Sequence, residues 1–205
     1  MSQFKKNHHL LEKNVSDLIK NGLEIISGNF YIKGSNDKHL QSMLLESFLL
    51  RSCSYWEYFL EKEIILLIKK KSESFKNYYD LPKSTIINVN LIRAILFGDK
   101  YKDFHDLKSL RSFFYKIIHP SVNPFESITN EQIQKLNFTY NLRNYLSHYS
   151  TYSKRKLQMS YNSKYGYTKF VEPGIFLLKN NGRYFESLLH NFVLISIVMR
   201  RKLGV

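Results

Sequence analysis

The chain has 205 residues, of which 43% are hydrophobic, and no stretch rich in Pro, Gly or Ser divides it, so we expect one domain over residues 1–205. Its 31 Lys and Arg against 17 Asp and Glu give a formal charge of +14, which favours a polyanionic partner. A single cysteine, Cys53, excludes an intramolecular disulfide and a thiolate-rich zinc site, and the apolar runs are far shorter than the roughly 20 residues of a membrane span.

Apolar residues at helical intervals predict an all-α chain. The longest predicted helix, over residues 38–71, has the character of a central strut and ends in three lysines, as the helix dipole prefers. Thr129 followed by Gln132 has the pattern of a capping box and begins a helix that leads to Arg143. The predicted helices cover residues 9–26, 38–71, 85–97, 103–118, 129–143 and 183–202.

The helical period is lost between Ser150 and Gly182. Turn signals on both sides of residues 175–178 are compatible with a short strand, in a small β-hairpin before the last helix. The last quarter of the chain, Thr151–Val205, carries ten Lys and Arg against two Glu, so +8 of the +14 charge lies there. The positive charge is therefore concentrated after the predicted helix that begins at Thr129.

No feature of the sequence indicates a cofactor or a secretory route. The seven histidines include no pair beside an acidic residue at the spacing of a helical metal site, so neither a metal ion nor another cofactor is expected. Cys53 is expected to be a small core residue. The N-terminus does not lead into the apolar core of a signal peptide, and we expect a cytoplasmic protein that makes no membrane contact.

Arg143 and His148 form the most informative pair in the chain. Arginine is a permanent planar cation that matches phosphate oxygens, and histidine exchanges protons near neutral pH, so the pair suggests phosphodiester chemistry. At about 100° per residue, positions five apart diverge by roughly 140° on an unbroken helix. Either the helix ends between them or the site is assembled from two chains. An Arg and a His can also merely compensate the dipole at a helix C-terminus.

The segment Arg143–His148 matches the pattern of Arg, polar residue, three variable residues and His that marks the HEPN superfamily of all-α ribonucleases. The chain resembles especially the RiboL-PSP-like HEPN domains, in which a long early helix carries an aromatic-Glu-aromatic element, here within Ser54–Leu60. This resemblance extends from about Leu40 to the C-terminus. It implies a HEPN-like helical bundle, a homodimer with both motifs in one cleft, and an endoribonuclease that acts as a toxin or a phage-defence (abortive infection) effector.

A metal-independent ribonuclease uses the RNA 2′-OH as its nucleophile. His148 would act as general base or acid, and Arg143 would stabilise the charge that develops on the phosphate oxygens. Asn144 would orient the histidine or the phosphate, or would only cap the helix end. Glu57 would tune the geometry of Arg143 or His148, or would form an ordinary salt bridge. Because one histidine cannot easily serve both sides of phosphorus in one step, a second copy in a dimer would be useful.

Cations and tyrosines after the motif are candidates for RNA contact. The cations would hold phosphates and the tyrosines would stack on unpaired bases, whereas the alternative is a solvated loop. These RNA-binding candidates are Lys154, Arg155, Lys156, Tyr149 and Tyr152.

Two further functions remain open. One is a catalytically inactive HEPN-like module that binds RNA or a protein. The other is a basic DNA-binding protein, although no helix-turn-helix or zinc signature is present. A toxin would have an antitoxin or other regulatory protein as partner. Some HEPN toxins carry a modifiable tyrosine two positions after the motif histidine, but Ser150 stands there in this chain, which argues against that mode of neutralisation.

Overall fold

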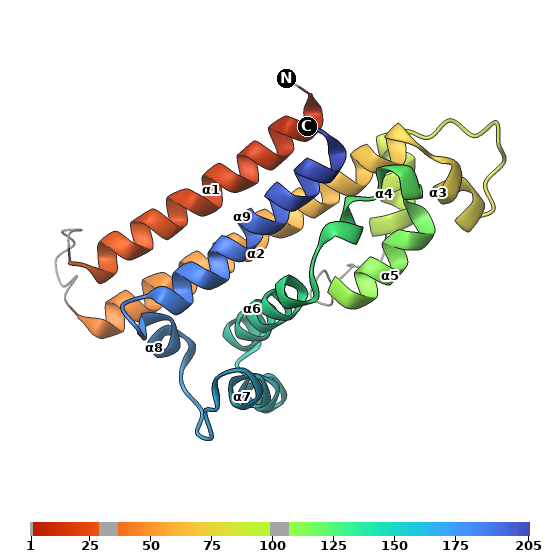
Figure 1. The fold of residues 1–205 in the computed structure, drawn as a ribbon. Helices are drawn as coiled ribbons and strands as arrows, with labels where there is room; N and C mark the ends of the chain where they lie inside the picture. The colour runs from red at the N-terminus through yellow and green to blue at the C-terminus, as the bar shows by residue number, and fades with distance from the viewer. Residues whose placement is uncertain (1, 29–36, 99–106) are drawn as a thin grey trace.

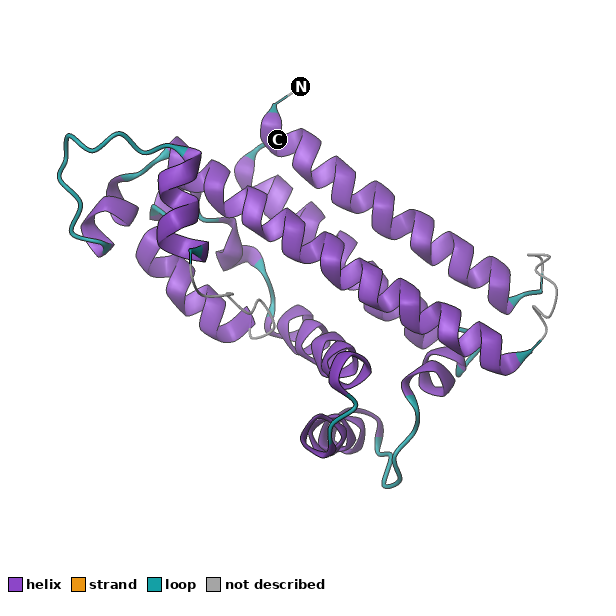
Figure 2. Ribbon diagram, turned by 180° about the vertical axis from the view of Figure 1, so that it is seen from behind, coloured by secondary structure: helices purple, strands orange, loops and turns teal. Residues whose placement is uncertain are grey.

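The computed structural model describes residues 2–28, 37–98 and 107–205, and every regular element in these ranges is an α-helix or a 3-10 helix (Figure 2). The prediction of an all-α helical bundle is therefore confirmed. No helix in the same ranges is long and apolar enough to cross a membrane. The elements are α1 Gln3–Ile26, α2 Lys38–Lys70, α3 Glu73–Tyr78, α4 Val89–Phe97, α5 Leu107–Ile117, η1 Pro120–Val122, η2 Pro124–Ser127, α6 Asn130–His148, α7 Thr151–Tyr165, α8 Pro173–Leu178 and α9 Arg183–Leu203.

Three long helices, α1, α2 and α9, run side by side and form the main layer of the fold (Figure 1). The predicted central helix is confirmed as α2, whose 33 residues span about 50 Å. Trp56 is fully buried in α2, with its ring 5.6 Å from that of Phe192 in α9, and Cys53 is buried one turn earlier, as expected. Gly22 lets α1 approach α9 closely, because a Cβ there would collide with the Phe185 ring.

A buried polar network joins these three helices. The carboxylate of Glu63 in α2 accepts a hydrogen bond from the Asn7 side-chain amide at 2.8 Å and lies 3.2 Å from His8 Nε2, both in α1. The other ring nitrogen, His8 Nδ1, lies 2.8 Å from Ser196 Oγ in α9. The side chains of His8 and Glu63 have no solvent exposure. The polar groups therefore satisfy one another inside the core, as buried polar groups must.

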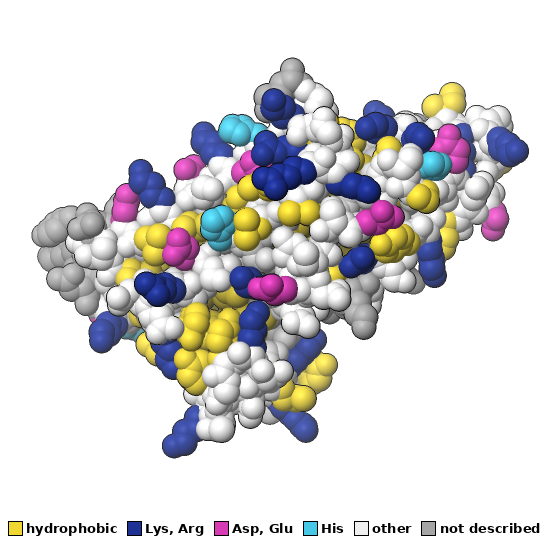
Figure 3. Space-filling model, in the orientation of Figure 1, with side chains coloured by type: hydrophobic (Ala, Val, Ile, Leu, Met, Phe, Trp, Pro, Cys, Tyr) yellow, Lys and Arg dark blue, Asp and Glu magenta, His cyan; other side chains and the backbone are white. Residues whose placement is uncertain are grey.

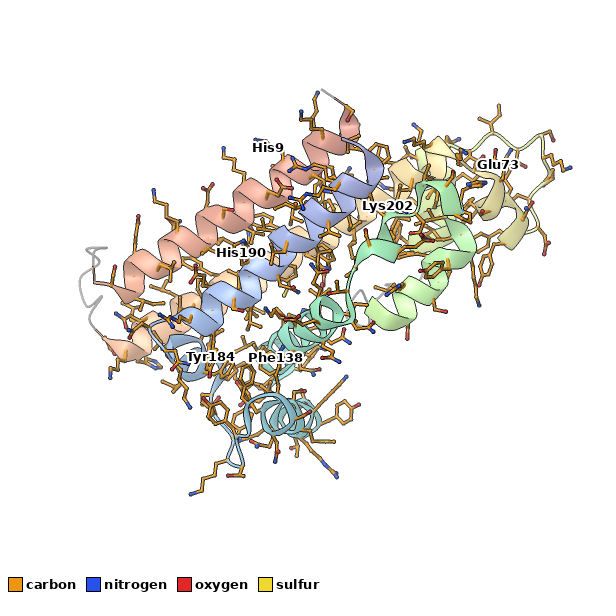
Figure 4. All side chains as sticks on the ribbon, in the orientation of Figure 1. His9, Glu73, Phe138, Tyr184, His190 and Lys202 are labelled. Carbon is orange, nitrogen blue, oxygen red and sulfur yellow. The ribbon has the colours of Figure 1, made fainter. Side chains whose placement is uncertain are left out.

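A second group of helices, α6, α7 and α8, packs below the main layer, and α6 contacts both α2 and α9 (Figure 1). Aromatic rings fill the junction between α6, α7, α8 and α9. Phe138 lies 5.2 Å from Tyr165 and 5.5 Å from Phe176, whose ring stacks on Tyr184 at 4.7 Å. Phe138 and Tyr184 mark the two sides of this cluster in Figure 4. The cluster fixes α6 and α7 against the rest of the molecule.

Each predicted helix is present, but α1 begins six residues and α6 ends five residues beyond the predicted range, and α4 begins four residues later than predicted. The Asn88 side chain accepts a hydrogen bond from the Leu91 amide and begins α4, which ends at Gly98 as predicted. The prediction over 103–118 corresponds to α5, with residues 103–106 outside the described part of the chain. The short helix α3 is an additional element. The apolar face predicted for α9 is confirmed, because all of its members are buried: Phe185, Leu188, Leu189, Phe192, Ile195 and Met199.

The segment between Ser150 and Gly182 contains two helices, α7 and α8, joined by irregular backbone, and no strand, so the proposed β-hairpin is wrong. Residues 175–178 belong to α8, which begins at Pro173 in the first helical position, where a missing N–H costs nothing. Phe176 and Leu177 are both buried, and such an adjacent pair does not follow the alternation of a half-buried strand. The preceding residues form α7, whose buried face consists of one residue per turn: Ser153, Leu157 and Tyr161.

Candidate active site

The motif lies at the C-terminal end of an unbroken helix, α6. The predicted capping box is present at its start: Thr129 Oγ1 accepts from the Gln132 amide at 3.2 Å, and Gln132 Oε1 accepts from the Thr129 amide at 2.9 Å. The helix ends at His148, and the capping residue Tyr149 has a left-handed backbone with φ of 46° and donates its N–H to the Tyr145 carbonyl. The alternative that the helix ends between Arg143 and His148 is therefore wrong.

Arg143 and His148 nevertheless line one pocket, together with Asn144. The pocket has a volume of about 260 Å³ and lies between the end of α6 and the start of α7. Asn144 and His148 are four residues apart and so are neighbours on the helix surface. The longer Arg143 side chain bends toward them, and its Nη1 donates to Asn144 Oδ1 at 3.1 Å. The remaining lining residues are Asn141, Ser150, Tyr152, Ser153 and Lys156.

Glu57 approaches the site from the central helix. Its Oε1 lies 4.0 Å from Arg143 Nη2 and accepts a hydrogen bond of 3.3 Å from the Tyr140 hydroxyl. The side chains of Arg143 and Glu57 are 25% and 19% exposed, so water screens this pair only in part. Burial first, and then the neighbouring Cys53 and Glu57, raise the pKa of Tyr140 well above its usual value. Tyr140 therefore remains a hydrogen-bond donor that holds the carboxylate beside Arg143.

The five candidates for RNA contact divide into two groups. Tyr152 and Lys156 line the same pocket as the motif. The other three lie at its flanks: Lys154 Nζ sits 4.6 Å above the Phe170 ring, Arg155 is exposed, and the Tyr149 ring packs 5.2 Å from that of Tyr145. These cations belong to α7 and not to a loop, and Lys and Arg side chains project from the end of the molecule where α7 lies (Figure 3).

The pocket favours an anion. Arg143 and Lys156 contribute positive charge to its wall, and none of its lining residues is acidic. Sequence reasoning missed Asn141, Ser150 and Ser153. The serines form a second capping box, in which Ser150 Oγ accepts from the Ser153 amide at 3.1 Å, and this S-x-x-S pattern was a signal that a helix begins there. Asn141 gave no separate signal.

Among the described residues, no cluster of three or more His, Cys, Asp or Glu side chains is placed to hold a metal ion. Cys53 lies fully inside the core, where burial raises the pKa of its thiol. Its thiol therefore has neither access nor charge for chemistry in the pocket.

Comparisons of the chain with protein-family models, with curated proteins and with solved structures find no match.

Proposed function

We propose that the chain is a metal-independent endoribonuclease whose active site is the pocket between α6 and α7. The observation that carries this proposal is the convergence of Arg143, Asn144 and His148 on one pocket that has no acidic lining residue. A proton-transfer group beside a fixed cation suits cleavage of a phosphodiester by its own 2′-OH. The same residues carry the resemblance to HEPN ribonucleases, which supports the proposal independently of the geometry.

The reaction assigns a separate task to each side chain. His148 takes the proton from the 2′-OH, whose oxygen forms a bond to phosphorus while the bond from phosphorus to the 5′-oxygen breaks. Arg143 stabilises the negative charge on the non-bridging oxygens, and Glu57 and Asn144 hold the guanidinium in place from two sides. The products are a 2′,3′-cyclic phosphate and a 5′-hydroxyl. DNA resists because it has no 2′-OH.

The leaving 5′-oxygen needs a proton from a second acid, on the side of phosphorus away from His148. His148 and Tyr149 are both exposed, so another chain has access to this end of α6. We propose that a homodimer supplies the second acid as His148 of a second copy. The cellular role that fits a small basic ribonuclease of this kind is that of a toxin or a phage-defence effector, restrained by an antitoxin or other regulatory protein.

A cleavage assay on total RNA tests this function. The wild type is compared with His148→Ala, and the matched control is His190→Ala, because His190 is an exposed histidine on α9, remote from the pocket (Figure 4). We expect His148→Ala to lose at least a hundredfold in rate, the usual contribution of a general acid or base, and His190→Ala to keep full activity. Equal activity of all three proteins would exclude the proposed site. Tight RNA binding without cleavage by the wild type would instead favour the inactive RNA-binding module.

A further inference from the structure

One face of α6 carries a continuous row of amide side chains that ends at the proposed catalytic histidine. Successive members are separated by four, three, four, three and four residues, a spacing that keeps them on one side of the helix. We call this row the amide stripe; it consists of Asn130, Gln134, Asn137, Asn141, Asn144 and His148. The opposite face of α6 belongs to the core, where Leu136, Thr139, Leu142 and Leu146 are buried. The stripe is therefore the polar side of a helix that is otherwise packed.

The surface along the amide stripe is hollowed from end to end. The active-site pocket shares Asn141 and Lys156 with a hollow of about 730 Å³ between α6 and α7. That hollow shares Gln134 and Asn137 with another, of about 600 Å³, between α5 and α6. Shared lining residues join the three hollows into one groove, which we call the stripe groove. It leads from His148 back to the start of α6.

The stripe groove is cationic. Arg111 of α5 lines one end, and Lys156 and Lys164 of α7 line the other side. None of the residues that line the three hollows is an Asp or a Glu. A ligand that fills the groove would meet positive charge along both walls, so the groove is complementary to a chain of negative charges.

The polar groups of the groove are suited to nucleotide bases. Each amide of the stripe can donate and accept hydrogen bonds, and the Asn137 oxygen is buried without a hydrogen-bond partner in the described structure. A buried acceptor without a partner is costly, which favours a ligand that donates to it. Exposed apolar surface lies beside the amides: Tyr152 is 76% exposed, Met159 65% and Tyr115 43%. Aromatic faces next to hydrogen-bonding edges are typical of sites for unpaired bases.

We propose that the stripe groove binds single-stranded RNA and guides it into the catalytic pocket. The proposal rests on the proposed function for the position of the scissile phosphate at His148. The 18 residue steps from Asn130 to His148 cover about 27 Å, which accommodates at most about eight nucleotides at the 3.4 Å spacing of a stacked strand. A duplex hides its base edges from the amides and its base faces from the tyrosines, so it should bind only through its phosphates.

The test measures RNA binding without cleavage. The His148→Ala protein is titrated into fluorescent single strands of four, eight and sixteen nucleotides and into a sixteen-base-pair duplex, and anisotropy gives each affinity. Gln134→Glu, added to that protein, places a negative charge in the groove at an exposed position. The matched control is Gln3→Glu, which makes the same change at the start of α1, across α2 and α9 from α6 (Figure 1). Thermal unfolding followed by circular dichroism checks that each variant is folded.

We expect affinity to rise from four to eight nucleotides and then to level off. Gln134→Glu should weaken binding of the eight-nucleotide strand about fivefold, the effect of one unit charge near a phosphate in water, while Gln3→Glu leaves it unchanged. Lys164→Gln should reduce the slope of log affinity against log salt by about 0.7, and Lys13→Gln, on α1, should not. Equal effects of the two glutamates would overturn the proposal, as would a duplex that binds as tightly as the strand. A Gln134→Glu protein that loses only self-association would show that a second copy covers the groove.

The experiments distinguish an error in the groove proposal from an error in the proposed ribonuclease function. If the wild type cleaves RNA, His148→Ala is inactive and the Gln134→Glu substitution changes neither cleavage nor binding, then only the groove proposal is wrong. If the wild type cleaves no RNA but Gln134→Glu selectively weakens single-strand binding, then only the catalytic proposal is wrong.

Discussion

Removing the carboxylate of Glu63 tests the buried network that joins α1, α2 and α9. Glu63→Ala leaves the fully buried His8 ring without its Nε2 partner and removes the 2.8 Å hydrogen bond of the buried Asn7 amide, which keeps only its bond to the Phe59 carbonyl. Each buried polar group left without a partner costs about 1–3 kcal/mol, and the lost side-chain volume adds to that cost. We expect the free energy of unfolding to fall by about 3–5 kcal/mol, the range found when one partner of a buried pair is removed.

Glu61→Ala is the matched control, because it changes the same residue type two positions away in the same helix. Glu61 pairs with Arg93 at 3.0 Å, but the two side chains are 32% and 44% exposed, so its loss should cost at most about 1 kcal/mol. The change in helix propensity is the same in both variants and cancels in the comparison. Urea unfolding followed by circular dichroism gives both values, and at about 3 kcal/mol per M the Glu63→Ala midpoint should fall by about 1–2 M. Equal midpoints for the two variants would refute the structural role of the network.

Three other predictions concern the chemistry, the assembly and the pH dependence of stability. RNA cleavage should persist in EDTA and leave 2′,3′-cyclic phosphate ends; activity that disappears on chelation and returns with Mg²⁺ would contradict this. Mixed dimers of wild type and His148→Ala should lose much more than half of the wild-type rate, and dimers that keep half or more would show that each chain works alone. Burial raises the pKa of Glu46, so the folded state loses stability as pH rises from the usual to the raised pKa of this carboxyl. Over that acidic range the urea midpoint of the wild type should fall relative to that of Glu46→Gln. A difference between the two midpoints that does not change with pH would contradict the shift.

The helices with a wide apolar face were predictable from the sequence, and those with a narrow one were not. The predicted face of α9 is buried in full, and the long apolar period of α2 correctly indicated the central helix. The helix α7 was not predicted because only one residue per turn packs against the rest of the fold, and exposed cations and tyrosines lie between these buried residues. In α8, the apolar residues 175–178 between two turn signals suggested a strand, because a helix of six residues has fewer than two turns and is too short to display a helical period.

The candidate site was predicted in its residues but not in its geometry. Around the helix axis Arg143 and His148 are separated by about 140°, an angle that describes the Cα positions and not the reach of the side chains. The structure brings both to one pocket because the arginine side chain extends along the helix surface to Asn144, and because α7 returns past the end of α6. Neither effect is visible in spacing alone. The angle therefore gives no support to a dimer, and a second copy is required only by the proton that the leaving oxygen needs.

The double role of α6 explains why the groove gave no signal in the sequence. The buried residues of α6 occur on every turn and pack into the core. The amides between them occupy positions where the polar side of a packed helix is expected, so their spacing does not by itself indicate a binding surface. Amides carry no charge, so the stripe does not contribute to the basic composition that suggested an anionic partner. Only the placement of α5 and α7 on either side supplies the cations that accompany it. In this fold the hydrogen-bonding groups and the positive charges come from different helices, and the proposed RNA-binding surface exists only once those helices are packed together.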